Sequence, residues 1–410
     1  MKYDFEKLLE RKGTGAIAVD SIGKMPGFAP DTPKEGFDLI PMWVADMNFI
    51  TCPTITERMK ERIEHPLFGY FDEGIEYYEA IIDWQKKRNN VKDLFPWNIS
   101  YENGVLGGVV TALRVLCSNG DKVLINSPTY IGFTRSIEEN GYRLVHSDLK
   151  KDKDGIFRLD FDDMERKVKE NGISVYVFCS PHNPVGRVWT KEELKELSSF
   201  AKQNHLYIIS DEIWSDIILD NNIHTPTQMG SKYLREHTIA LYAPSKTFNL
   251  AGLIGSYHIC YNEYLQERIR KEGSLSHYND MNLLSRDALL GAYSPCGHEW
   301  VDELKEVLTE NIHIAYDFLT KKGIEISKPE GTYMLFLDCT NYCKEHNLTI
   351  DKLLKKGWDV GVAWQDGRPF HGECHIRMNV ALPKERLLEA INRLAKYVLS
   401  KNTREYPAFK

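Results

Sequence analysis

The chain has 410 residues, of which 42% are hydrophobic and 27% charged, a composition that excludes collagen-like, low-complexity and wholly disordered proteins. Its 52 basic and 59 acidic residues give a net charge of −7 without any basic block, which argues against nucleic acid or an anionic membrane as the principal partner. A chain of this length is expected to form two domains, or one large domain with an appendage.

The sequence shows neither a membrane span nor a secretory signal. No stretch approaches the roughly 18 consecutive apolar residues of a span, and the N-terminal sequence MKYDFEKLLERKG is charged throughout. The eight cysteines lack the short spacing of a disulfide framework, and some lie inside apolar runs such as VYVFCS. We therefore expect a cytoplasmic protein with reduced thiols.

Residues 1–48 contain several glycines and prolines and no domain-sized pattern, so we expect this segment to pack with the smaller C-terminal domain. Residues 49–285 are expected to form a large α/β domain. Short β-rich runs alternate there with helical segments; the runs are KVLIN (122–126), VYVFCS (175–180), LYIIS (206–210) and TIALYAP (238–244). The clearest helix is predicted over 191–203, with Thr190 as its N-cap. This alternation predicts a mainly parallel central sheet flanked by helices.

Residues 286–410 are expected to form a smaller α+β domain. A long helical pattern over about 300–321 precedes an apolar run at 331–338, GTYMLFLD. Another helix is predicted near 349–356, a strand within 375–382 and a final helix from about residue 384.

A glycine-containing turn runs into an apolar helix in the segment NGVLGGVVTALRVL, at residues 103–116. The backbone N–H groups of Val105 and Leu106 are expected to point at an anion there. The glycines do not match the dinucleotide fingerprint, because both its spacing and its acidic partner are missing. A purely structural turn would give the same pattern.

Asn183 and Asp211 follow two of the predicted strands. Asn183 lies in the proline-bounded turn of SPHNPVGRVW, where its amide is placed to hydrogen-bond a ligand. Asp211 ends the strand LYIIS, where a carboxylate can pair with a protonated ring nitrogen. Structural alternatives remain open, because Asn-Pro makes turns and an aspartate in this position can cap a helix.

Lys246 follows the strand TIALYAP within APSKTFNLAG, at the sheet edge where α/β folds bind ligands. An amine in this position can form a Schiff base with an aldehyde cofactor, if its pKa is lowered enough to leave it partly neutral. A lone Ser-Lys pair is more often part of a surface loop. The four segments together nevertheless suggest an enzyme that uses pyridoxal phosphate (PLP).

No metal is expected. The potential ligands Cys339, Cys343 and His346, and those of HGECH at 371–375, match no structural zinc spacing.

The order of these segments resembles that of the fold-type I PLP-dependent enzymes, the aspartate aminotransferase superfamily. Within it, the chain is most similar to the MalY/PatB-type carbon–sulfur lyases, the cystathionine β-lyase and cystalysin group. The segments that carry the resemblance are VADMNF, FGY, SPTY, FCSPHNPVGRVW, SDEI, APSKTFNLAG and IRMNVALP, which span residues 44–383. The resemblance implies the PLP-dependent transferase fold and a homodimer with shared active sites.

The resemblance also implies a role for each matching residue. Lys246 would form the Schiff base and move the Cα proton, Asp211 would pair with the pyridine nitrogen, and Asn183 would bond the phenolic oxygen. Tyr130 would stack on the cofactor ring.

The remaining matches concern the phosphate, the substrate and the neighbouring subunit. Ser245 would assist phosphate binding, and Arg377 would clamp the substrate α-carboxylate with a bidentate pair. Tyr70 would reach the partner's phosphate across a dimer interface, and residues 277–280 would complete the neighbour's site. Tyr70 is also compatible with ordinary packing.

Two positions depart from the pattern of the superfamily. Many aminotransferases have a phosphate-binding arginine eight residues after the lysine, whereas this chain has Ile254. Trp214 stands where aminotransferases often have Tyr and the better-known lyases have His. Because Trp cannot accept a hydrogen bond, the usual second contact to the ring oxygen is in doubt.

The resemblance favours PLP-dependent β-elimination of L-cysteine S-conjugates such as cystathionine, releasing a thiol, pyruvate and ammonia. The alternative is an aminotransferase acting on an L-amino acid and a 2-oxo acid, because fold alone does not fix the reaction. A PLP-binding regulatory module fused to a DNA-binding domain is disfavoured, since residues 1–48 are too short for such a domain and the chain is acidic.

Overall fold

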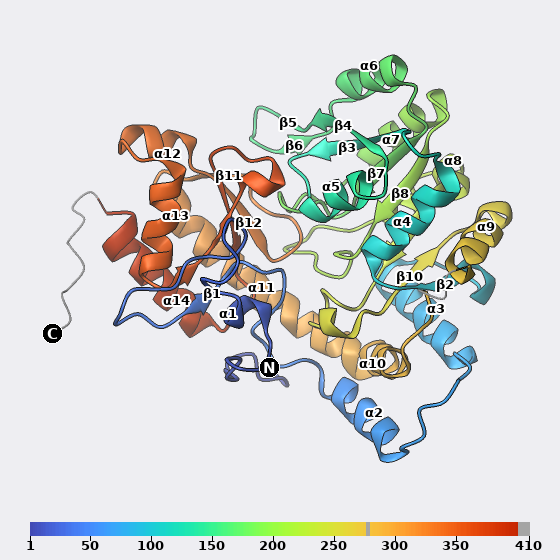
Figure 1. Ribbon diagram of the computed structural model, residues 1–410, viewed down its shortest axis with the longest axis horizontal. Helices are drawn as coiled ribbons and strands as arrows, with labels where there is room; N and C mark the ends of the chain where they lie inside the picture. Colours follow the sequence, from blue (N-terminus) through green and yellow to red (C-terminus); the bar gives the residue numbers. More distant parts are fainter. Residues whose placement is uncertain (276–278, 401–410) are drawn as a thin grey trace. The chain divides into compact units, whose positions relative to one another are not determined.

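The computed structural model describes residues 1–275 and 279–400, and its internal contacts divide the chain into two units. The larger unit comprises Thr51–Asn183 and Arg187–Asp302, and the smaller comprises Met1–Ile50, Pro184–Gly186 and the chain from Glu303 onward (Figure 1). The division falls later in the chain than residue 286, where the sequence pattern placed it. The reason is that α10 (Leu283–Ala292) packs against α2 (Pro53–Glu64) and α3 (Ile75–Asn89) of the larger unit.

A seven-stranded sheet forms the centre of the larger unit. In spatial order its strands are β2 (Ile99–Glu102), β10 (Ser256–Ile259), β9 (Thr238–Tyr242), β8 (Tyr207–Asp211), β7 (Val175–Cys179), β3 (Lys122–Ser127) and β4 (Arg143–Asp148). The strands from β9 to β4 are parallel, and β10 pairs antiparallel with both of its neighbours. This is the mainly parallel α/β architecture that the sequence predicted. A short hairpin, β5 (Lys150–Lys151) and β6 (Phe157–Arg158), stands apart from the sheet.

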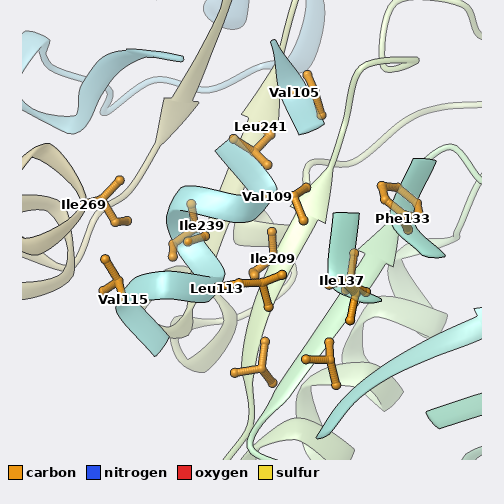
Figure 2. Close-up of a cluster of buried hydrophobic side chains, with 14 of the residues drawn as sticks. Val105, Val109, Leu113, Val115, Phe133, Ile137, Ile209, Ile239, Leu241 and Ile269 are labelled. Atoms are coloured by element: carbon orange, nitrogen blue, oxygen red, sulfur yellow. The ribbon is translucent and has the colours of Figure 1, made fainter. Parts of the chain in front are cut away.

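Helices cover both faces of this sheet. One hydrophobic cluster joins the strands to α4 (Val105–Leu116), α5 (Ile131–Glu138) and α9 (Glu263–Ser274), and Figure 2 shows Val109 and Leu113 of α4 among Ile209 and Ile239. Asn126 points to the other face, where its amide contacts the sulfur of Met164 in α6 (Phe161–Asn171) at 3.8 Å. Burial on both faces explains why these strands read as continuous apolar runs.

Helices α7 (Lys191–Gln203) and α8 (Lys232–His237) also belong to the larger unit. The start of α7 is fixed by its first residues. Thr190 accepts a hydrogen bond from the Glu193 amide at 3.2 Å, and Glu193 accepts one from the Thr190 amide at 2.8 Å. This reciprocal cap confirms the helix start that was predicted at Thr190.

The smaller unit is an α+β structure built on a four-stranded antiparallel sheet. Its strands, in spatial order, are β11 (Glu325–Ile326), β12 (Met334–Asp338), β15 (His375–Asn379) and β14 (Gln365–Asp366). Its helices are α1 (Ile17–Asp20), α12 (Thr340–Glu345), α13 (Ile350–Asp359) and α14 (Lys384–Arg393), and α11 (Pro295–Lys321) continues into it from the larger unit.

The N-terminal segment lies against the elements of the smaller unit (Figure 1). Its strand β1 (Ile40–Pro41) pairs parallel with β13 (Val362–Ala363). The Asn379 amide donates to the carbonyls of Val44 and Asp46, both at 2.6 Å, and the Tyr333 hydroxyl donates to Ala45 at 3.1 Å. These bonds attach the segment that precedes residue 50 to β15 and to the residue directly before β12.

Within residues 1–275 and 279–400, the model contains no helix with the length and apolar character that a bilayer crossing requires.

The close contact between α10 and α2 predicts how a substitution at Gly291 changes the stability of the larger unit. A Cβ added at Gly291 would lie 2.6 Å from the Thr54 carbonyl oxygen and 2.7 Å from the Ile55 Cα. Backbone atoms cannot move aside cheaply, so Gly291→Ala should lower the free energy of unfolding by about 1–3 kcal/mol, although alanine is intrinsically the better helix former. Chemical denaturation measures the effect. Gly252→Ala, whose methyl would meet open space, is the control and should change stability little.

Candidate active site

Three side chains chosen from the sequence lie after neighbouring parallel strands. Asn183, Asp211 and Lys246 follow or end β7, β8 and β9, which are adjacent in the sheet. Cys179 of β7 pairs with Asp211, and the Ser180 amide donates to the Asp211 carbonyl at 2.9 Å. Parallel strands bring their carboxyl ends to one edge, so the structure gathers these residues where α/β folds place ligands.

Asp211 is a buried carboxylate. Burial raises its pKa to about 7, while the Ile213 amide, which donates to Oδ1 at 3.0 Å, and the nearby Lys246 ammonium act to lower it. Taking a carboxylate out of water favours its neutral form unless a cation faces it. A protonated ring nitrogen is a cation of the required kind.

Lys246 is half-buried, and its amine lies near the side chain of Trp214. Its Nζ lies 5.9 Å from the ring centroid of Trp214, which is only 2% exposed. This distance is at the outer limit of a cation–π contact, so the indole shields the amine more than it attracts it. The structure thus places Trp214, the residue that departs from the superfamily pattern, next to the lysine.

A buried carboxylate fixes the loop that carries Lys246. Thr247 donates its hydroxyl hydrogen to Asp216 Oδ2 at 2.9 Å, and Trp84 Nε1 donates to Asp216 Oδ1 at 3.1 Å. All three side chains are buried, and burial raises the pKa of the Asp216 carboxyl. Asp216 belongs to the turn after β8, so it holds the loops after β8 and β9 together.

Asn183 and Tyr130 lie on loops that are also connected. His182 Nε2 is 2.8 Å from the Pro128 carbonyl oxygen, and burial lowers the pKa of His182 to about 4. The imidazole is therefore neutral at pH 7, and it must donate from Nε2 because a carbonyl oxygen only accepts. Asn183 is 3% exposed, and the Tyr130 ring is half-buried, edge-on to Phe133 at 5.6 Å between centroids.

The predicted anion turn is present. Helix α4 begins at Val105, after Gly104 with φ +79°, a backbone angle that glycine adopts without strain. A Cβ at Gly104 would lie 3.8 Å from Ile254 Cγ2, so Ile254 lies beside this turn. A Cβ at Gly132 would collide with both Tyr130 and Leu106, which shows that the aromatic ring and the start of α4 are neighbours.

The two remaining site candidates of the larger unit, Ser245 and Tyr70, differ in how exposed they are. Ser245 is half-buried directly before Lys246. Tyr70 is fully exposed on the loop between α2 and α3, so its side chain packs against nothing within residues 1–275 and 279–400. Of the stretch 277–280, His277 and Tyr278 lie outside the described residues, and Asn279 accepts from the Asn103 amide at 2.6 Å, directly before the anion turn.

Arg377 belongs to the smaller unit, on β15, and is 3% exposed. Its Nη2 donates to the Trp43 carbonyl at 3.0 Å and to Gln365 Oε1 at 2.6 Å. Its guanidinium carbon lies 4.1 Å from the ring centroid of Phe370. A buried guanidinium held in this way is suited to receive a carboxylate.

Among the residues of these arrangements that were not anticipated from the sequence are Trp43, Asp216, Gln365 and Phe370. Asp216 had a usable signal, since it stands five residues after Asp211 in the same polar turn. The other three had none, because their relation to Arg377 arises from cross-strand pairing and tertiary packing.

The residues of the larger unit fit a phosphorylated pyridine aldehyde. The helix start at Val105 suits its phosphate, buried Asp211 needs a cation, and Lys246 offers an amine. No cluster of three His, Cys, Asp or Glu side chains arranged for a metal ion occurs in the described part of the chain.

Comparison with known proteins gives one family match and close structural neighbours. The family described as aminotransferase class I and II matches residues 39–394. Cystathionine beta-lyase PatB of Bacillus subtilis is 31% identical over 396 residues, which cover 95% of this chain and 98% of the relative.

Two solved structures share nearly the whole fold. A PLP-bound protein from Clostridium difficile, provisionally named an aminotransferase, has a TM-score of 0.86 and 33% identity, covering 96% of this chain and 98% of its own. Cystalysin from Treponema denticola, which contains pyridoxal 5'-phosphate, has a TM-score of 0.86 and 30% identity with the same coverage of 96% and 98%.

The raised pKa of Asp211 predicts a pH dependence for the protein freed of any bound ligand. Between the ordinary value of 3.8 and the folded value of about 7, the folded state binds more protons than the unfolded state. The free energy of unfolding should therefore fall as the pH rises through this window. Asp211→Asn has no charge to bury, so it should melt above wild type at pH 8 and keep a smaller advantage at pH 5. Thermal scans test this, and equal destabilisation at both pH values would contradict it.

Proposed function

The chain belongs to the aminotransferase class I and II family, and on this premise we propose that it is a PLP-dependent carbon–sulfur lyase acting on L-cysteine S-conjugates. The resemblance and the type I fold inferred from the motifs are confirmed by the family match and by the solved structures. The observation that carries the proposal is the gathering of Asn183, Asp211 and Lys246 at one sheet edge, in a chain 31% identical to a cystathionine beta-lyase.

In this proposal the larger unit binds PLP. Lys246 anchors the aldehyde carbon, Asp211 faces the ring nitrogen, and Asn183 donates to the phenolic oxygen. Tyr130 stacks on the ring. The amides of Val105 and Leu106, with Ser245, receive the phosphate. The half-buried setting of Tyr130 beside the start of α4 supports this assignment.

PLP, when bound, supplies an acceptor for the electrons left when Cα loses its proton. Lys246 Nζ would take that Cα proton. Asp211 remains ionised opposite the protonated ring nitrogen, since that cation opposes the effect of burial on its pKa. Arg377 binds the substrate α-carboxylate. Water and the conjugate yield a thiol, pyruvate and ammonia.

Transamination is the second candidate, because the Clostridium difficile structure carries an aminotransferase name. Ile254 argues against it. The side chain lies beside Gly104 of the anion turn, where many aminotransferases have an arginine, so this chain binds the phosphate without that charge.

We also propose a homodimer, supported by an exposed apolar loop between α2 and α3. The large apolar side chains of this loop and of the adjoining helix ends are 37–111% exposed; they are Ile63 of α2, Leu67, Phe68, Tyr70 and Phe71 of the loop, and Ile75 of α3. A soluble protein rarely exposes so many together unless they form an interface. Tyr70 reaches the phosphate bound by the partner in this proposal.

The exposed loop is held in place by the side chain of Arg62. Arg62 donates from Nη1 to the His65 carbonyl at 2.6 Å and from Nη2 to the Leu67 carbonyl at 2.5 Å. Its guanidinium carbon lies 5.3 Å from the ring centroid of Phe68. These contacts order the loop before any partner binds, which lowers the entropy cost of association.

A cytoplasmic location remains part of the proposal. It is supported by buried free thiols, such as Cys179, Cys260 and Cys339, which are typical of a reducing compartment.

Lys246→Ala tests the reaction. The variant should release less than about one-thousandth of the wild-type pyruvate from cystathionine, because the covalent anchor and the proton carrier are both lost. Wild type should release pyruvate without any added 2-oxo acid, as measured by a coupled lactate dehydrogenase assay. Lys271→Ala, at an exposed lysine paired with Glu267, is the control and should be fully active. Dependence on a 2-oxo acid would support transamination instead.

Phe68→Asp tests the dimer. A charge on the apolar loop should shift the protein to a monomer in light scattering and reduce activity at least tenfold, since the neighbour's site loses Tyr70. Ile223→Asp places the same charge on another exposed apolar residue and should leave a dimer. A fully active Phe68→Asp monomer would count decisively against shared sites.

A further inference from the structure

Three cysteines of the smaller unit lie together where β12 ends and α12 begins. Asp338 is paired with His375 at the end of the β12–β15 ladder, and one step further the Cys339 amide donates to the Cys374 carbonyl at 2.9 Å. Cys343 lies one helical turn after Cys339, since its amide donates to the Cys339 carbonyl at 2.8 Å. Backbone pairing therefore brings Cys339, Cys343 and Cys374 to one place, although Cys374 is distant from the other two in the sequence.

The thiols of Cys343 and Cys374 form a contacting pair within this cluster. These two thiols hydrogen-bond each other, whereas the Cys339 thiol donates to the Leu337 carbonyl at 3.7 Å. A disulfide holds its sulfur atoms about 2 Å apart, so two hydrogen-bonded thiols need only a small movement to reach bonding distance. The structure thus favours Cys343 and Cys374 over the other possible pairs.

The backbone around Cys374 is fixed by a tight turn before β15. The Gly372 amide donates to the Gly367 carbonyl at 3.1 Å, and the Gly367 amide donates to the His375 carbonyl at 2.9 Å. A Cβ added at Gly372 would lie 2.5 Å from Phe336 Cζ, so the turn packs closely on β12. Cys374 is therefore held beside the start of α12 before any reaction, which limits the strain of a cross-link.

The two thiols differ in exposure and in acidity. Cys374 is half-buried, whereas Cys343 is only 5% exposed. Burial raises the pKa of Cys343 to about 12, and the charge and hydrogen bond of the Cys374 sulfur contribute to this rise. A reagent from solution therefore reaches Cys374 first. Once the Cys374 sulfur is part of a mixed disulfide it carries no charge, so Cys343 then ionises more readily.

We propose that Cys343 and Cys374 are a modification site, at which a low-molecular-weight disulfide converts them to a reversible intramolecular disulfide. The inference is independent of the proposed function, because neither residue is assigned a role in binding PLP or substrate. The cross-link joins α12 to the turn that precedes β15. The site thereby responds to the ratio of small disulfides to small thiols around the protein.

The exchange consists of two displacements. The Cys374 thiol gives its proton to water, and the resulting thiolate attacks one sulfur of the small disulfide, whose S–S bond breaks and releases one thiolate. The Cys343 thiol then gives its proton to water and attacks the Cys374 sulfur, which releases the second thiolate. Two protein thiols are oxidised to one disulfide, and the small disulfide is reduced to two thiols.

The probe is glutathione disulfide, added in excess to the reduced holoenzyme at pH 8. Remaining thiols are blocked with N-ethylmaleimide, and the protein is cleaved with chymotrypsin without reduction, because cleavage after Tyr342 separates Cys339 from Cys343. Mass spectrometry should find the peptide of Cys343 joined to the peptide of Cys374. Dithiothreitol should release the two peptides from each other.

Three variants identify the roles of the two thiols. Cys343→Ser should stop after the first displacement and retain one glutathione on Cys374. Cys374→Ser should leave Cys343 unmodified, because the buried thiol is not reached directly. The control is Cys117→Ser, at another half-buried cysteine, which should form the cross-link at a rate within twofold of wild type.

Four results would overturn the proposal. The first is a cross-link in the wild type that contains Cys339 in place of Cys343, and the second is a cross-link that forms only after unfolding in urea. The third is a wild-type Cys374 that keeps its glutathione without forming a cross-link. The fourth is a Cys374 that stays unmodified in the folded protein.

Discussion

The buried carboxylate of Asp211 at the end of β8 is the interaction on which the proposed site depends. Burial raises its pKa to about 7, so the folded chain keeps a full negative charge there only when a cation faces it. The nearby Lys246 ammonium opposes this effect of burial without cancelling it, and a protonated ring nitrogen is a cation that a cofactor would bring. Parallel pairing of β7, β8 and β9 delivers Asn183 and Lys246 to the same edge, and Asp216 holds the loops after β8 and β9 together through Thr247.

The smaller unit buries a charge of the opposite sign. Arg377 is 3% exposed, and the Trp43 carbonyl, the Gln365 amide and the Phe370 ring that hold it are all uncharged. In the proposed function, the substrate carboxylate would face Arg377 and a protonated ring nitrogen would face Asp211.

Local signals in the sequence were sufficient for the elements that local chemistry determines. The helix 191–203 has the predicted bounds, and its start is fixed because Thr190 and Glu193 cap each other. Strands that are buried on both faces read as apolar runs in the sequence. Asp211 and Lys246 stand at or just after the ends of two such runs, so their position at the same edge of the sheet was predictable. Gln365 and Phe370 were not, since their contacts with Arg377 depend on the pairing of β14 with β15 and on tertiary packing. The unit boundary was placed too early because the packing of α10 on α2 has no signature in composition.

Elimination and transamination would both begin with removal of the substrate Cα proton, so the roles proposed for Lys246, Asp211 and Asn183 suit both. The two reactions would differ in the next event: in transamination Lys246 Nζ would deliver the proton to a cofactor carbon, whereas in elimination the β-substituent would leave. In the proposed function, the groups that favour one outcome would therefore lie near Lys246 Nζ. Ile254, beside Gly104, alters the charge at the anion turn. Trp214, 5.9 Å from Nζ and 2% exposed, alters the surroundings of the amine itself, since an indole excludes water and offers it no acceptor. Trp214 is thus a departure from the superfamily pattern that lies beside the amine proposed to move this proton.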